Sequence, residues 1–170
     1  MLSSAQLNGA LLGVADMPPG YAKDTSPDAS GEHTFCNYKV PVKQKAGAKV
    51  TYTKGGGLAV TVAEVSLKEY ASSKRAQDAF TALSSTLDTC HGETYAGSKL
   101  AYDPMSVVKV GDKTLGVRIT SGGMTVLDQF ALDGPVIISA GNGGMMSVDA
   151  SEVTTLIQAQ VDKYDQAARQ

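Results

Sequence analysis

The sharpest chemical possibility in this chain lies in its two cysteines and two histidines. His33-x-x-Cys36 and Cys90-His91 would supply two thiolates and two imidazoles, a donor set that Zn²⁺ takes in tetrahedral sites. Adjacent residues such as Cys90 and His91 do not easily turn toward one ion, and closed zinc sites normally space their ligands two to four residues apart. In a chain without a Cys-x-x-Cys motif, a disulfide is the simpler expectation. Two free thiols are the third alternative.

The expected Cys36–Cys90 disulfide has consequences for stability and for the compartment. It would close a loop of about 55 residues and, in the loop-entropy model, contribute about 4 kcal/mol to the free energy of unfolding. Such bonds persist in oxidising compartments. The start of the sequence, MLSSAQLNG, has neither a charged region nor a long apolar core. We therefore expect an exported protein whose leader peptide precedes the sequence given.

Two motifs of hydrolases, Gly-x-Ser-x-Gly and His-Glu-x-x-His, do not occur in the sequence. A hydrolase with its residues far apart in sequence would need His33 or His91 as its base, and both flank the cysteines, where a structural role is the favoured interpretation. Glycines 55–57 indicate a hairpin turn, and the Gly-Asn-Gly-Gly run at 141–144 indicates a loop before the last helix. We expect no enzyme, cofactor or metal, with a hydrolase lacking a motif as a second alternative.

Several side chains are candidates for binding an apolar ligand. Methionine adapts to ligands of varied shape, and an apolar pocket with a few polar groups is the usual form of a small-molecule site. Arg118 is expected to face solvent or pair with a carboxylate, and a ligand contact is the less favoured alternative. The alternative interpretation is that these side chains fill the hydrophobic core. The candidate ligand-binding residues are Tyr95, Tyr102, Arg118, Met124, Met145 and Met146.

Composition limits the classes of partner. The chain has 170 residues, enough for one domain over 1–170, and 19% of them are charged. A net charge of -2 and a pI near 5.6 give no positive field for nucleic acid. The sequence contains no run of 18 apolar residues, which is about the length that a transmembrane helix needs.

Three helices are expected to position these residues. Residues 72–92 place Ala76, Phe80 and Leu83 at steps of three and four, which predicts an amphipathic helix with Cys90 on its last turn. This helix is interpreted as the central packing element. A second long helix is expected from Asp149 onward, and residues 3–13 predict a short one with Ser3 and Gln6 as a capping box.

The strands are expected to form one antiparallel sheet. Leu58, Val60 and Val62 alternate with small or polar residues, which predicts one buried face, and a bulge near Ala63 and Glu64 would explain the later change of phase. Residues 15–35 indicate an extended surface segment, and 93–103 a polar loop or short strand. The expected strands are 48–53, 58–67, 107–110, 114–121, 124–132 and 136–140. The fold class is α+β: a twisted antiparallel sheet of about five to six strands packed against two main amphipathic helices, with a short N-terminal helix and one disulfide.

The order of these features resembles the actinobacterial extracytoplasmic sensor-like domains, typified by the extracellular domain of the mycobacterial receptor kinase PknH and by related lipoproteins. The resemblance rests on LLGVADMPPGY, on a cysteine before the first hairpin, on VTVAEVSLKEYASSKRAQDAFTALSSTLDTC, and on VVKVGDKTLGVRIT followed by a hairpin and a closing helix. It implies an α+β domain outside the membrane, a disulfide, a cleft for an unidentified ligand, and a lipoprotein signal with an acylated cysteine. This chain differs from the receptor-kinase domain because it has a single cysteine pair and no tryptophan. Of the family's functional residues, the resemblance is therefore applied only to Cys36 and Cys90.

Together these observations predict a non-catalytic extracytoplasmic sensor domain of a cell-envelope lipoprotein. It would bind an apolar or amphiphilic small molecule in a cleft between sheet and helix. The chain would be lipid-anchored on the outer face of the cell membrane or secreted. The alternative is a protein-interaction module of the envelope, which predicts an exposed apolar patch without a deep pocket.

Overall fold

The structure, a computed structural model, describes residues 1–26, 34–146 and 148–169. Its α-helices are α1 (Ser4–Ala10), α2 (Ser73–Thr89) and α3 (Ala150–Ala168). Its strands are β1 (Ala22–Lys23), β2 (Ala46–Lys54), β3 (Thr61–Glu69), β4 (Gly92–Tyr95), β5 (Ser98–Pro104), β6 (Lys113–Ser121), β7 (Met124–Asp133) and β8 (Val136–Gly144). Short 3₁₀ turns occur at η1 (Val14–Asp16), η2 (Phe35–Asn37) and η3 (Gly57–Ala59).

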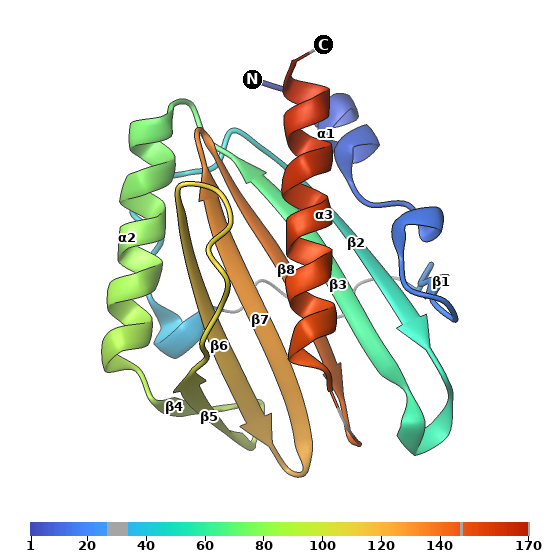
Figure 1. Ribbon diagram of the computed structural model, residues 1–170. Helices are drawn as coiled ribbons and strands as arrows, with labels where there is room; N and C mark the ends of the chain where they lie inside the picture. The colour runs from blue at the N-terminus through green and yellow to red at the C-terminus, as the bar shows by residue number, and fades with distance from the viewer. Residues whose placement is uncertain (27–33, 147, 170) are drawn as a thin grey trace.

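The strands form one antiparallel sheet in the order β1-β2-β3-β8-β7-β6-β5-β4 (Figure 1). From β4 to β8 the chain is a meander of hairpins, and its tight turns contain Gly122-Gly123 and Asp133-Gly134, which fall between the strands expected at 114–121, 124–132 and 136–140. The meander ends in the middle of the sheet, where β8 pairs with β3 along nine residues. The two halves of the sheet are therefore joined by the pairing of β3 with β8, two strands that are far apart in sequence.

Each face of the sheet is covered by different helices. Alternate residues such as Val65 and Ile138 point to one face, where they pack with Leu156 and Ile157 of α3 and with α1. The intervening residues, among them Ile137, point to the other face and pack with Phe80 of α2. Ser72 caps α2 and Asp149 caps α3, each by accepting a backbone N–H bond through its side chain. Because the largest core cluster contains α3 and no residue of α2, the expectation that α2 is the central packing element is wrong.

The sheet has eight strands, so the expected number of five to six is too low. Residues 93–103, expected as a polar loop or a short strand, belong to the two strands of the β4–β5 hairpin, and β1 adds a short edge. Residues 107–110, expected as a strand, are irregular, and Val107 lies against Gly116 of β6, where a side chain would collide with it. Val107 and Val110 therefore pack on the domain, whereas Val108 between them is exposed.

The first hairpin also departs from expectation. Leu58 lies in η3 and is 70% exposed, and Val62 is on the less covered face, so the buried face belongs to Ala63, Val65 and Leu67. The pairing of β2 with β3 keeps one register from Thr61 to Glu69, and the expected bulge near Ala63 and Glu64 is absent. The pattern of apolar residues changes phase because the strand begins later than predicted.

Two glycine-rich or polar segments also fold differently from prediction. Residues 141–144, expected as a loop, complete β8 in the centre of the sheet. In the segment expected to be extended and superficial, Met17 and Tyr21 are buried and β1 pairs with β2. The rest of that segment, residues 27–33, lies outside the described residues.

Candidate functional site

The two cysteines form a disulfide. Cys36 of η2 is bonded to Cys90 at the end of α2, with their Cα atoms 6.2 Å apart. This confirms the expected pairing, and the zinc and free-thiol alternatives for the cysteines are wrong. His33, the other residue of the zinc hypothesis, lies outside the described residues. Among the residues that are described, no cluster of three or more His, Cys, Asp or Glu side chains could hold a metal ion.

Tyr102 belongs to the packing around the disulfide. Its side chain is 3% exposed, and the ring of Phe35 lies edge-on to it with centroids 5.1 Å apart. The Tyr102 hydroxyl donates to Glu93 at 2.5 Å, and the same carboxylate oxygen accepts the Cys36 N–H. Burial and the neighbouring Glu93 carboxylate raise the pKa of Tyr102 well above its usual value. Tyr102 is thus placed in the core, away from any open binding surface.

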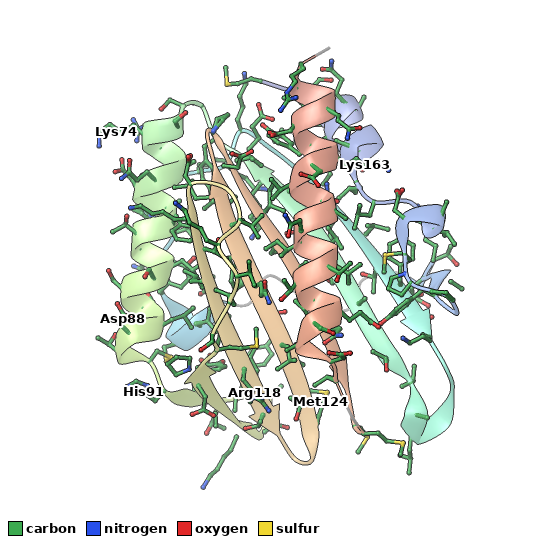
Figure 2. All side chains as sticks on the ribbon, viewed as in Figure 1. Lys74, Asp88, His91, Arg118, Met124 and Lys163 are labelled. Atoms are coloured by element: carbon green, nitrogen blue, oxygen red, sulfur yellow. A yellow bond between two sulfur atoms is a disulfide. The ribbon has the colours of Figure 1, made fainter. Side chains whose placement is uncertain are left out.

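The hydrolase alternative requires His33 or His91 beside a nucleophile, and of the two only His91 lies in the described part of the chain. His91 is exposed just beyond the end of α2 (Figure 2), and no hydrogen bond of its ring to a serine or carboxylate is found in the described part of the chain. Two carboxyl groups with raised pKa values, Asp128 and Asp133, lie on β7. Burial raises the pKa of Asp128 to about 7 and that of Asp133 to about 6. The raised pKa values follow from burial and from nearby carboxylates, Glu64 for Asp128 and Asp165 for Asp133.

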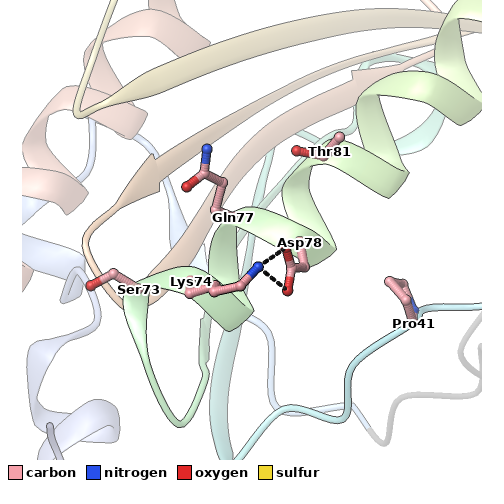
Figure 3. A pocket seen from close by; sticks show the side chains of 6 residues that line it. All are labelled: Pro41, Ser73, Lys74, Gln77, Asp78 and Thr81. Carbon is pink, nitrogen blue, oxygen red and sulfur yellow. Dashed lines mark hydrogen bonds and ion pairs between the residues drawn. The ribbon is translucent and has the colours of Figure 1, made fainter.

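Two open hollows are found on the described surface. The first, of about 580 Å³, lies between α2 and Pro41 and is lined mainly by polar side chains, including the Lys74–Asp78 ion pair (Figure 3). The second, of about 520 Å³, lies across the ends of β5, β6 and β7, from Lys99 to Met124. Neither is the apolar cleft between sheet and helix that the sequence led us to expect, although Met124 lines the second.

Three chain segments meet at one end of the sheet. The register places Thr61 of β3 and Thr125 of β7 on either side of Gly144, the last residue of β8. The β2–β3 turn, the β6–β7 turn and the segment after β8 therefore lie side by side, at the end of the molecule opposite the two termini (Figure 1). Figure 2 labels Met124 at this end, away from Lys74 at the start of α2.

These segments expose large apolar side chains, and we call the surface they form the apolar end. The exposed fraction is 70% for Leu58 and 69% for Met146, and each of the other members is at least 39% exposed. Half of the large apolar side chains that are exposed in the described chain belong to it. The apolar end consists of Leu58, Val62, Met124, Met145 and Met146.

A polar cluster behind the apolar end holds the β2–β3 hairpin against α3. Glu152, in the first turn of α3, accepts a hydrogen bond from the Tyr21 hydroxyl at 2.5 Å and pairs with Lys54 at 3.1 Å. The Lys54 ammonium also lies 4.5 Å from the centre of the Tyr21 ring. Because Lys54 is the last residue of β2, these contacts fix the base of the turn that presents Leu58.

The six residues predicted to bind ligand are only partly brought together. Met124, Met145 and Met146 meet at the apolar end, whereas Tyr102 is buried and Tyr95 is exposed at the β4–β5 turn. Arg118 is exposed on β6. Sequence reasoning missed Leu58 and Val62, which it assigned to a buried strand face. The signal that could have found Leu58 is the run of three glycines directly before it.

Comparison with known proteins supports the fold. No family model and no curated protein sequence matches the chain. Among solved structures, the chain is similar to the extracellular domain of PknH from Mycobacterium tuberculosis, with a TM-score of 0.68 and 10% sequence identity over 99% of this chain and 98% of that one. The resemblance inferred from the sequence is therefore confirmed for the fold. In the described residues no helix is long and apolar enough to cross a bilayer.

Proposed function

We propose that this chain is a non-catalytic extracytoplasmic recognition domain that binds apolar or amphiphilic groups at the apolar end. The observation that carries the proposal is the meeting of Leu58, Met124 and Met146 on three adjacent turns, exposed to solvent. Soluble proteins seldom expose contiguous apolar surface without a use for it. Methionine side chains are flexible and polarisable, which suits contact with partners of varied shape.

The placement outside the cytoplasm is supported by two features. The disulfide between Cys36 and Cys90 is of the kind that persists in oxidising compartments. The fold is shared with a domain described as extracellular.

The binding part of the proposal is tested with the amphiphilic dye anilinonaphthalene sulfonate, whose fluorescence rises on apolar surfaces. We expect saturable binding to the wild type and about tenfold weaker binding to the triple variant Leu58→Ser, Met124→Ser, Met146→Ser, because each change removes exposed apolar surface. The matched control carries Val14→Ser, Val40→Ser and Val108→Ser, which are exposed elsewhere. Equal binding by all three proteins would overturn the proposal.

The compartment is tested separately in the native cell. A thiol-reactive maleimide that cannot enter the cytoplasm should label Cys36 and Cys90 only after reduction, because the bond occupies both sulfurs. Labelling that requires cell lysis, with both thiols free, would contradict an extracytoplasmic location.

A further inference from the structure

The apolar end has the chemistry of a surface that enters a lipid bilayer. Residues 55–63, 119–127 and 134–148, which contain its members, include no Asp, Glu, Lys or Arg. Charged residues come directly before or after these stretches, as Lys54 and Glu64 do on either side of residues 55–63. Burial of these stretches in lipid therefore takes none of their own residues' charges out of water, which is the main cost of inserting protein into hydrocarbon. Lys99, which lines the second hollow together with Met124, is the charged side chain that has to stay at the level of the headgroups.

The turns at the apolar end have open space around their glycines, and the β6–β7 turn also forms one wall of the second hollow. A Cβ atom added at Gly56, Gly57, Gly122 or Gly123 would have no neighbouring atom within 4 Å. Leu58 and Met124 follow directly on these glycines, so their side chains stand on projecting turns. A fluid bilayer accommodates separate projections, whereas a folded protein partner needs matching depressions.

The size of the surface also favours lipid over a second folded protein. Its five side chains, between 39% and 70% exposed, present on the order of a few hundred Å². A stable protein interface buries about 800 Å² on each partner. Shallow insertion into a membrane interface needs only a few apolar side chains, and its strength grows with the area buried.

We propose that the apolar end inserts Leu58, Met124, Met145 and Met146 into the interfacial region of a phospholipid bilayer. This inference rests on the proposed function, because it names the amphiphile that the recognition surface meets. In this orientation the two termini, at the opposite end of the sheet, point away from the bound membrane (Figure 1). Glu152 and Lys54 lie behind the inserted turns and hold the hairpin during contact.

The chain contains no tryptophan, so a single introduced tryptophan reports only its own surroundings. We would place it at the apolar end with Met146→Trp, and outside it with Val108→Trp as the matched control. Each variant of the 170-residue chain, with its disulfide oxidised, is mixed with vesicles of phosphatidylcholine and phosphatidylglycerol in equal parts. We expect a blue shift and quenching by brominated acyl chains for Met146→Trp and neither for Val108→Trp.

Flotation of the untagged chain with the same vesicles measures affinity. The Leu58→Ser, Met124→Ser, Met146→Ser variant should lower the partition coefficient by about tenfold or more, whereas the Val14, Val40 and Val108 control should keep it. Absence of wild-type binding to these vesicles, or equal quenching at both tryptophans, would overturn the proposal. If the dye still binds the apolar end while vesicles do not, lipid insertion fails and the recognition surface is left for a protein or a free amphiphile. If neither binds, the proposed function fails as well.

Discussion

Glu64 of β3 and Asp128 of β7 lie on either side of Gly141, the β8 residue with which both are paired. Glycine leaves the space between the two carboxylates without a side chain. Burial, and then repulsion from Glu64, raises the pKa of Asp128 from 3.8 to about 7. One carboxyl in the middle of the sheet therefore changes charge near neutral pH.

This pair predicts a pH-dependent stability. The folded chain holds the Asp128 proton more tightly than the unfolded chain, so the free energy of unfolding should fall as the pH rises from about 4 to about 7. Asp128→Asn should flatten this dependence and raise the free energy of unfolding at pH 7.5 by about 1–3 kcal/mol. Urea unfolding at pH 5 and pH 7.5 measures both. The control is Asp162→Asn, at an exposed position on α3, and a wild type that is most stable at pH 7.5 would contradict the prediction.

Gly141 should be sensitive to the smallest side chain. A Cβ at this position would collide with the Asp128 carboxylate, so Gly141→Ala should cost about 2–4 kcal/mol of unfolding free energy. Adding Asp128→Ala should recover at least about 1 kcal/mol, measured as the coupling in a double-mutant cycle. Gly56→Ala, in open space, should change stability by less than about 0.5 kcal/mol. Additive effects at positions 141 and 128 would show that the two do not compete for space.

The disulfide should contribute strongly to stability. It links residues 54 apart in sequence, and the loop-entropy model gives about 4 kcal/mol for its loss. Cys36→Ser with Cys90→Ser should lower the free energy of unfolding by that amount, and dithiothreitol should destabilise the wild type but leave the double variant unchanged. A reductant effect below about 1 kcal/mol on the wild type would refute the estimate.

Gln160 of α3 should hold the N-terminal segment in place. Its buried carboxamide accepts the Leu12 N–H at 2.9 Å and donates to the Ala10 carbonyl at 2.7 Å. Gln160→Ala would leave buried backbone groups unpaired and cost about 2–3 kcal/mol, with faster hydrogen exchange at the Leu12 amide. Gln158→Ala, exposed on the same helix, is the control. Unchanged exchange at Leu12 would remove Gln160 from this role.

Much of the fold could be predicted from local patterns. The apolar stripes of α2 and α3, the turns at Gly122-Gly123 and Asp133-Gly134, and the Cys36–Cys90 pair all depend on residues close in sequence or on the lack of another cysteine. Residues 141–144 could not be assigned in this way. From sequence alone, Gly141 and Gly143 indicate a loop. The structure shows that they are strand residues, and that the side chains of Asp128 and Val126 on the neighbouring strand fill the space above them.

The candidate site was partly predictable for the same reason. The sequence offers Met124, Met145 and Met146 as candidates for contact with an apolar ligand, but sequence alone could not show that β3, β7 and β8 bring their ends together. Leu58 fits an alternating strand pattern, and only the late start of β3 at Thr61 exposes it. The meeting of the strand ends and the exposure of Leu58 both depend on how distant strands pair, which local periodicity does not encode.

The methyl spectrum of the chain labelled with [methyl-¹³C]methionine tests the central claim most directly. There are six methionines, and Met17, which is 8% exposed, serves as an internal reference. On addition of dihexanoylphosphatidylcholine below its micelle concentration, the resonances of Met124, Met145 and Met146 should move together while Met17 stays fixed. Changes confined to Met17 or Met105, or no change at any methyl group, would contradict recognition at the apolar end.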